Sequence, residues 1–143
     1  MRIVAFDFGL RRIGVAVGNQ TTGTAQAVDT IAAMDGEPDW RHLHKLLDEW
    51  RPGILVVGLP LNMDQTESEM SIRAREFSRA LTEASGIESV MVDERLSSAG
   101  ADHLLNEVAA QTTSTRKHRN KRILARDSLA AELILRTYLN ENP

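Results

Sequence analysis

The first nineteen residues, Met1–Asn19 with the sequence MRIVAFDFGLRRIGVAVGN, decide the fold. Arg2–Phe8 is a short run of β-branched and aromatic residues, and Ile13–Val17 resumes that pattern after a glycine-containing segment. Two such runs around a tight turn predict a β-hairpin. Asp7 stands near the end of the first run, although aspartate is depleted in strands. A lone acid in this position either caps the turn or serves a functional site, and both interpretations stay open at this point.

The rest of the chain alternates apolar runs with helical periodicity. Strands are predicted over Ala25–Ile31, Ile54–Val57 and Val90–Val92, and Asp35–Pro38 is predicted as a loop whose proline starts a helix. Helices are predicted over residues 40–50, 70–84, 97–108 and 123–139. Strands joined by short turns should be antiparallel, and strands reached through helices should be parallel to the first. The order predicts one α/β domain over residues 1–143, with a mixed five-stranded sheet and helices on both faces.

Composition excludes several classes of site. The chain has 143 residues and no cysteine, so disulfides, thiolate metal sites and cysteine nucleophiles are excluded. No segment approaches the roughly 20 apolar residues of a membrane span, and no targeting segment precedes the first strand. We therefore expect a cytoplasmic protein without membrane contact. The formal net charge of -3 by itself argues against a nucleic-acid partner.

The charge is unevenly distributed along the chain. Between Gln111 and Arg126 there is no acid, and this basic segment holds six Lys and Arg residues, namely Arg116, Lys117, Arg119, Lys121, Arg122 and Arg126. The rest of the chain has eleven Lys and Arg residues and all twenty acids. The basic segment therefore has a formal charge of +6, and the rest of the chain has a formal charge of -9. From Gln111 up to Ile123 we expect a mobile loop that contacts phosphate. The alternative is a solvated loop that connects two helices without binding anything.

Three acidic positions are unexpected for their predicted elements. Asp127 falls on an apolar helical stripe with Leu124 and Ala131, where a carboxylate is costly unless it is paired. A salt bridge to a neighbouring arginine or a place at the edge of the stripe would also explain it. The pair Asp93 and Glu94 ends a predicted strand, where ligand-binding residues of α/β sheets collect.

Asp7 ends a strand predicted to be parallel to that one, so all these acids can meet at one end of the sheet. Carboxylates without cysteine or paired histidines make an all-oxygen site, which suits Mg²⁺ or Mn²⁺. Two such ions would activate water and stabilise the leaving oxygen of a phosphodiester. No serine, cysteine or histidine constellation offers a competing arrangement.

Four ordered motifs resemble one known family. They are DFG at residues 7–9 followed by RRIGVAV, VGLPLNMD at 57–64, DERLSS at 93–98 and NKRILARDSLAA at 120–131. Together they are similar to the YqgF/RuvX family of RuvC-like nucleases, which have the ribonuclease H fold. The resemblance covers essentially the whole chain. The family has been described as Holliday junction resolvases and as nucleases that mature the precursor of 16S ribosomal RNA.

The resemblance implies a set of site residues. Catalytic acids that hold the metal are expected at Asp7, Glu94 and Asp127, with Asp93 sharing or taking the second role. Lys121 is expected to contact phosphate, and Arg95 to hold the scissile strand or orient the acids. The family often has lysine where this chain has Arg11, which preserves charge but not geometry. The expected nucleic-acid-binding residues are Arg11, Arg12, Arg95, Arg116, Lys117, Arg119 and Lys121.

The expected function is a metal-dependent endonuclease that hydrolyses phosphodiesters of structured nucleic acid, with 16S rRNA precursor ahead of branched DNA. Resolution of a Holliday junction would require a two-fold dimer, whereas we expect a monomer or weak homodimer. A non-catalytic binding module is a distant alternative that the intact acid set disfavours. An ATP-handling protein of the actin type would need a second domain around the nucleotide.

Overall fold

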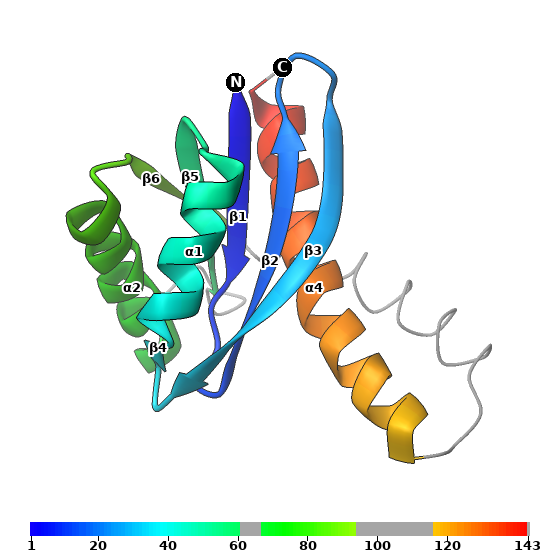
Figure 1. The fold of residues 1–143 in the computed structure, drawn as a ribbon. Helices are drawn as coiled ribbons and strands as arrows, with labels where there is room; N and C mark the ends of the chain where they lie inside the picture. Colours follow the sequence, from blue (N-terminus) through cyan, green and yellow to red (C-terminus); the bar gives the residue numbers. More distant parts are fainter. Residues whose placement is uncertain (61–66, 94–115, 143) are drawn as a thin grey trace.

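The central element is a single mixed sheet. The structure is a computed structural model that describes residues 1–60, 67–93 and 116–142, with the backbone alone over residues 116–127. Within these ranges the sheet has six strands in the order β4-β3-β2-β1-β5-β6 (Figure 1). The strands are β1 (Arg2–Asp7), β2 (Arg12–Asn19), β3 (Thr24–Met34), β4 (Glu37–Pro38), β5 (Ile54–Leu59) and β6 (Ser89–Asp93). As predicted, β1, β2 and β3 are antiparallel neighbours, whereas β5 and β6 are parallel to β1.

The predicted strand count of five is wrong, because the segment predicted as a loop contains β4. Glu37 and Pro38 pair antiparallel with the end of β3. Proline has no N–H to donate, which an edge strand tolerates. Pro38 therefore precedes the first helix instead of starting it, and Asp39 takes the N-cap position.

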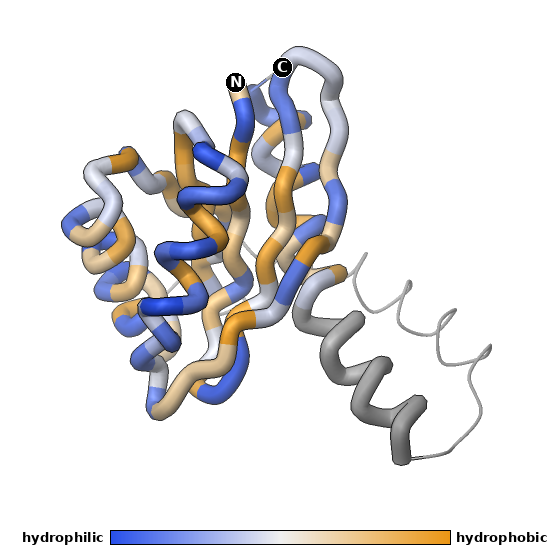
Figure 2. Tube along the Cα trace, viewed as in Figure 1, coloured by the Kyte–Doolittle hydropathy of each residue, from blue (hydrophilic) through white to orange (hydrophobic). Residues whose placement is uncertain are grey.

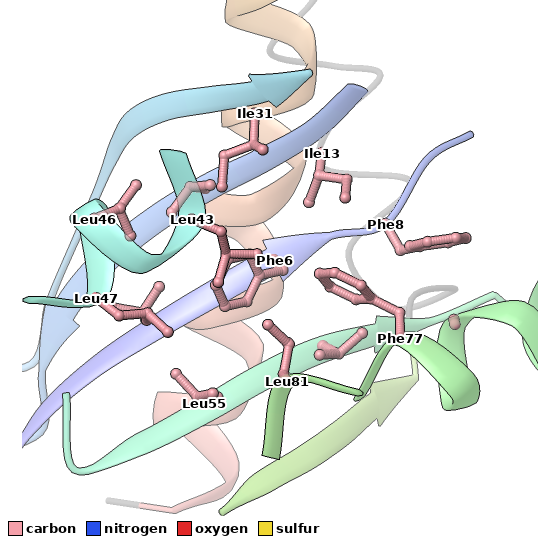
Figure 3. Close-up of a cluster of buried hydrophobic side chains, with 14 of the residues drawn as sticks. Phe6, Phe8, Ile13, Ile31, Leu43, Leu46, Leu47, Leu55, Phe77 and Leu81 are labelled. Carbon is pink, nitrogen blue, oxygen red and sulfur yellow. The ribbon is translucent and has the colours of Figure 1, made fainter. Parts of the chain in front are cut away.

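Helices cover both faces of the sheet, as predicted. Helices α1 (Trp40–Trp50) and α2 (Glu69–Ser85) pack on one face, and α4 (Arg116–Glu141) packs on the other (Figure 1). Strand alternation divides the side chains between these layers. Val4 and Phe6 belong to the first core, and Figure 3 shows Phe6 among side chains of α1 and α2. Ile3 and Ala5 belong to the second core, under α4.

Strand β5 supplies both cores. All six of its residues, ILVVGL, are buried, which is typical of a central parallel strand covered on both faces. Figure 2 shows the same pattern, with hydrophobic residues along the inner strands and hydrophilic residues on the outward sides of the helices.

Local signals set the ends of α1 and α2. The Asp39 side chain accepts a hydrogen bond from the His42 N–H, and Arg51 closes α1 in the left-handed conformation at φ 47°. Ser68 and Ser71 form a capping box at the start of α2, and Gly86 ends the helix at φ 73°. Both helices lie where periodicity predicted them.

Helix α4 is longer than predicted. It begins at Arg116 and not near Ile123, so the expectation of a loop is wrong for residues 116–122. Arginine and lysine are good helix formers, and this stretch contains neither glycine nor proline. The rest of the predicted loop, residues 111–115, and the predicted helix over 97–108 lie outside the described residues. Among the described helices, none has the length and hydropathy needed to span a membrane.

Close packing between α4 and β2 depends on Gly18. A Cβ atom at this position would lie 2.8 Å from Leu135 Cδ2 and closer still to the Thr24 carbonyl oxygen. We expect Gly18→Ala to lower the free energy of unfolding by about 1–3 kcal/mol through overpacking. Urea denaturation would measure the change, with Gln26→Ala at an exposed position of β3 as the control. An unchanged midpoint for Gly18→Ala would contradict this packing.

Candidate active site

The candidate site lies at the edge of the sheet where the parallel strands end. Asp7 is the last residue of β1, and Asp93 is the last residue of β6. Strand β5 lies between these two and runs in the same direction. The carboxyl ends of parallel strands are where open α/β sheets bind ligands. The structure therefore brings two of the predicted acids to one edge.

Asp7 faces α4. It follows Ile3 and Ala5 in the alternation of β1, and both of those residues lie in the second core. Its side chain is half-buried at the end of that core. A carboxylate in this position is partly removed from water and aims at the layer between sheet and helix.

Glycines flank Asp7 on both sides. Its partner on β2 is Gly14. On β5 the register pairs Phe6 with Val57, so Gly58 is the next residue beside Asp7. Glycine weakens a strand interior and often marks a place where a ligand or another backbone approaches closely. Neither of the two strand neighbours of Asp7 therefore carries a side chain.

Asp93 lies on the opposite face from Asp7. Met91 packs on the first core, and the Ser89 hydroxyl is bonded to Ser78 of α2. Alternation therefore directs Asp93 towards α2, whereas Val92 belongs to the second core with Asp7's neighbours. Glu94, the adjacent predicted acid, lies outside the described residues.

The backbone of α4 passes close to the cross-strand row of residues, one from each neighbouring strand, to which Asp7 belongs. Register places Asp7, Gly14 and Thr30 side by side on β1, β2 and β3. The Thr30 Oγ1 lies 3.2 Å from Ser128 Oγ, and Ser128 Oγ also donates to the Asp29 carbonyl oxygen at 3.1 Å. With strands about 4.8 Å apart, this anchor lies roughly 10 Å from Asp7 along the row. Residue 127, which precedes Ser128 in α4, therefore lies near the level of Asp7 along the sheet, and its side chain lies outside the described set.

The helix runs antiparallel to β1. At the other end of the sheet, Gln20 Nε2 donates to the Asn142 carbonyl oxygen at 2.8 Å. The first half of α4 consequently extends past the edge that holds Asp7 (Figure 1). This half carries the sequence positions of four predicted nucleic-acid-binding residues, Arg116, Lys117, Arg119 and Lys121.

Two further predicted cations lie at the same edge. Arg12 is exposed and belongs to the α4 face, because Ile13 and Val15 of the same strand point into the first core. Arg11 is exposed in the turn that precedes β2, and its carbonyl oxygen accepts a hydrogen bond from the Ala33 N–H. Arg95 lies outside the described residues.

Within residues 1–60, 67–93 and 128–142, for which side chains are described, no three acidic, histidine or cysteine side chains form a metal-binding group. Only Asp7 of the three predicted metal ligands belongs to that set. Asp7 is an oxygen donor, as Mg²⁺ and Mn²⁺ require, and its place at the carboxyl edge fits a metal ligand.

Sequence reasoning missed three contributors to this edge. Gly14 and Gly58 interrupt apolar strand patterns, and an isolated glycine inside such a pattern is a recognised signal of close approach. Ser128 gave no comparable signal, because its hydroxyl contact with Thr30 joins residues 98 positions apart.

Comparisons with solved structures define the class of fold. The fowlpox virus resolvase, solved with its substrate Holliday junction DNA, is 14% identical with a TM-score of 0.59, covering 99% of this chain and 98% of that one. RuvC of Thermus thermophilus, in complex with a Holliday junction substrate, is 16% identical with a TM-score of 0.54, covering 99% and 96%. The chain therefore has the ribonuclease H-like fold of RuvC-like resolvases.

Relatives at higher identity give the family. A protein of Chromohalobacter salexigens named "Putative pre-16S rRNA nuclease" is 45% identical over 141 residues, which is 98% of this chain and 90% of the relative. A protein of Yersinia enterocolitica with the same name is 52% identical over 99 residues, 69% and 71% of the two chains. The family model described as "RuvX: Holliday junction resolvase" matches residues 1–141. The chain belongs to this RuvX family of RuvC-like nucleases, as the motifs predicted.

Proposed function

We propose that this protein is a divalent-metal-dependent endonuclease whose substrate is the precursor of 16S rRNA. The observation that carries the proposal is the position of Asp7 in a chain of a nuclease family. Asp7 is half-buried at the carboxyl edge of the parallel strands, faces α4 and is flanked by glycines. Residues 1–143 are taken as one nuclease domain acting in the cytoplasm, as a monomer or weak homodimer.

The residues that would hold the metal are Asp7, Glu94 and Asp127. When bound, one or two Mg²⁺ or Mn²⁺ ions would supply an activated water and stabilise the charge of the leaving oxygen. The protein's own contribution is to fix carboxylate oxygens at the edge of the sheet. Gly14 would admit the scissile phosphate beside Asp7 because it carries no side chain.

Strand register supports Glu94 as the second acid. Asp93 is directed to the α2 face, and Asp7 to the α4 face. The side chain of Asp93 therefore points away from the face on which Asp7 would hold a metal ion. Of the pair Asp93 and Glu94, we therefore assign Glu94 as the second acid that holds the metal ion with Asp7.

Cations at the same edge would hold the nucleic-acid backbone. Arg12 lies on the α4 face beside the row of Asp7, and the basic half of α4 extends past that edge. Phosphate contacts of this kind position a strand without reading its sequence. Arg11, Arg95 and Lys121 complete the proposed binding set.

The names of the close relatives favour ribosomal RNA precursor over branched DNA, whereas the distant structural neighbours are bound to Holliday junctions. Cleavage of the two substrates should be measured side by side with Mg²⁺ and with Mn²⁺. We expect the RNA precursor to be cut at specific positions and the four-way junction to be cut weakly. Symmetric cutting of the junction with intact RNA would establish the resolvase alternative, and cleavage of neither would leave a binding module.

We expect Asp127→Asn to reduce turnover by at least about 100-fold while leaving substrate affinity within a factor of about two. The amide preserves the volume of the carboxylate and removes a charged metal ligand, and even outer-shell partners of ligands cost 10–100-fold. Single-turnover cleavage and filter binding of the same RNA would separate the two quantities.

A structural role for Asp127 would give the opposite pattern. If this residue only pairs with a neighbouring arginine, Asp127→Asn should lower the melting temperature and leave cleavage nearly intact. Asp48→Asn, at an exposed position of α1, is a matched control that should change neither property.

A further inference from the structure

A concave site lies on the face of the sheet opposite Asp7. It is a cavity of about 200 Å³ between the β4 edge, the start of α1 and the middle of α2. Phe8 and Phe77 from the first core line it, with ring centroids 5.2 Å apart (Figure 3). Trp40 lines it as the first residue of α1 and is half-buried. Phe8 and Phe77 are almost fully buried and form the floor of the cavity, whereas Trp40 is the more accessible aromatic ring.

The charged residues that line this cavity are mostly acidic. Among the residues whose side chains are described, Asp35, Glu37 and Glu76 line it together with one cation, Arg73. The formal charge of the lining is therefore -2. A phosphate group would be repelled from it, so this surface does not extend the nucleic-acid-binding edge on the other face.

The one cation is already engaged. Arg73 Nη1 lies 3.1 Å from Asp35 Oδ1, and Arg73 Nη2 donates to the Asp35 carbonyl oxygen. Its guanidinium also packs under Gly36, which has φ +84°. Within the lining, Arg73 is therefore already paired with Asp35, which leaves Glu37 and Glu76 as the acids without a cationic partner among the lining residues.

The two remaining acids differ in how they are engaged. Glu37 Oε1 accepts a hydrogen bond of 2.5 Å from Trp40 Nε1, which holds the indole at the rim. Glu76 is exposed, and in the part of the chain whose side chains are described it has no hydrogen bond or ion pair. A cation over the Trp40 ring face would be attracted both by the ring quadrupole and by the neighbouring carboxylates.

We propose that this cavity binds an arginine side chain presented by a protein partner. The volume is below the ~300 Å³ at which pockets for drug-sized ligands begin, so a single side chain fits its scale. A guanidinium can stack on the Trp40 indole and still reach Glu76 with its fork of N–H donors. The methylene stem would lie against Phe8 and Phe77. A protein partner docked here leaves the Asp7 edge open to nucleic acid, and the proposal does not depend on the substrate assigned above.

The two tryptophans provide a test by NMR in the intact chain. The peptide acetyl-Gly-Arg-Gly-amide should be titrated into ¹⁵N-labelled protein, with matched peptides carrying lysine or norleucine instead of arginine. We expect the Trp40 indole N–H and the amides of Gly36 and Ala80 to shift with the arginine peptide, less with lysine and not with norleucine. Trp50 lies elsewhere, under the guanidinium of Arg2 at 5.7 Å, and its indole signal should not move.

Two substitutions at exposed positions of α2 provide a test variant and its matched control. Glu76→Gln should weaken binding of the arginine peptide about fivefold, and Glu83→Gln on the same helix should not. Unmoved Trp40 signals at saturating peptide would overturn the proposal. An equal response to norleucine, or equal affinity of Glu76→Gln and wild type, would do the same. Shifts of Trp40 with a short RNA duplex in place of the peptide would also contradict it.

Discussion

Replacing Asp7 with asparagine is expected to reduce cleavage by at least about 100-fold and to leave the fold intact. Asparagine preserves the shape of the side chain, so the packing at the end of β1 is unchanged. The substitution removes the negative charge that a divalent ion requires. If Asp7 lies among other acids, losing one charge should also relieve repulsion and raise the melting temperature.

Cleavage assays under excess substrate, combined with thermal unfolding, would measure both consequences. Asp48→Asn again supplies the control, because it makes the same chemical change on the opposite face of the sheet. An Asp7→Asn protein that cuts RNA at the wild-type rate would remove Asp7 from the catalytic site. The turn-capping interpretation of this residue would then be the correct one.

The second large effect is expected from the basic half of α4. Substituting Arg116, Lys117 and Arg119 with alanine should weaken binding to every nucleic acid tested by roughly 10- to 100-fold. It should also reduce the slope of log K against log salt by up to about 2.7 for duplex DNA, at about 0.9 per phosphate neutralised. Alanine is the best helix former, so the substitutions should preserve α4.

A matched triple variant separates this effect from net charge alone. Arg41, Lys45 and Arg79 are exposed on α1 and α2, and their replacement by alanine removes the same charge from the other face. That variant should bind nucleic acid as the wild type does. If the two triple variants behave alike, α4 is not the binding surface, and the contacts would have to come from Arg11, Arg12 and Arg95.

Strong patterns in the sequence predicted most of the fold. The alternation of β1 and β2 around a short turn predicted the hairpin, and the unbroken apolar run at residues 54–57 predicted a strand buried on both faces. These patterns succeed because successive side chains of a strand point to opposite faces, so the order of apolar residues indicates which faces are buried. The four motifs likewise indicate the family, because comparing residue types and their order along the chain requires no knowledge of the structure.

The errors arise where local composition admits two structures. The stretch at residues 116–122 is polar throughout, and its high charge without apolar periodicity predicts a loop, although its residues favour helix. Strand β4 has only two residues, too few for a periodic signal, and its pairing depends on the end of β3. The opposite orientations of Asp7 and Asp93 depend on register between strands, which single-sequence patterns do not reveal.

The central claim is a metal site on the α4 face at the Asp7 edge, and Mn²⁺ titration followed by NMR tests it most directly. Paramagnetic broadening by substoichiometric Mn²⁺ should affect the amides of Asp7, Gly14 and Gly58 first and leave Gly53, at the other end of β5, sharp. Asp7→Asn should abolish that selectivity. Equal broadening in the variant, or broadening that begins at the acidic lining around Glu37 and Glu76, would contradict the account.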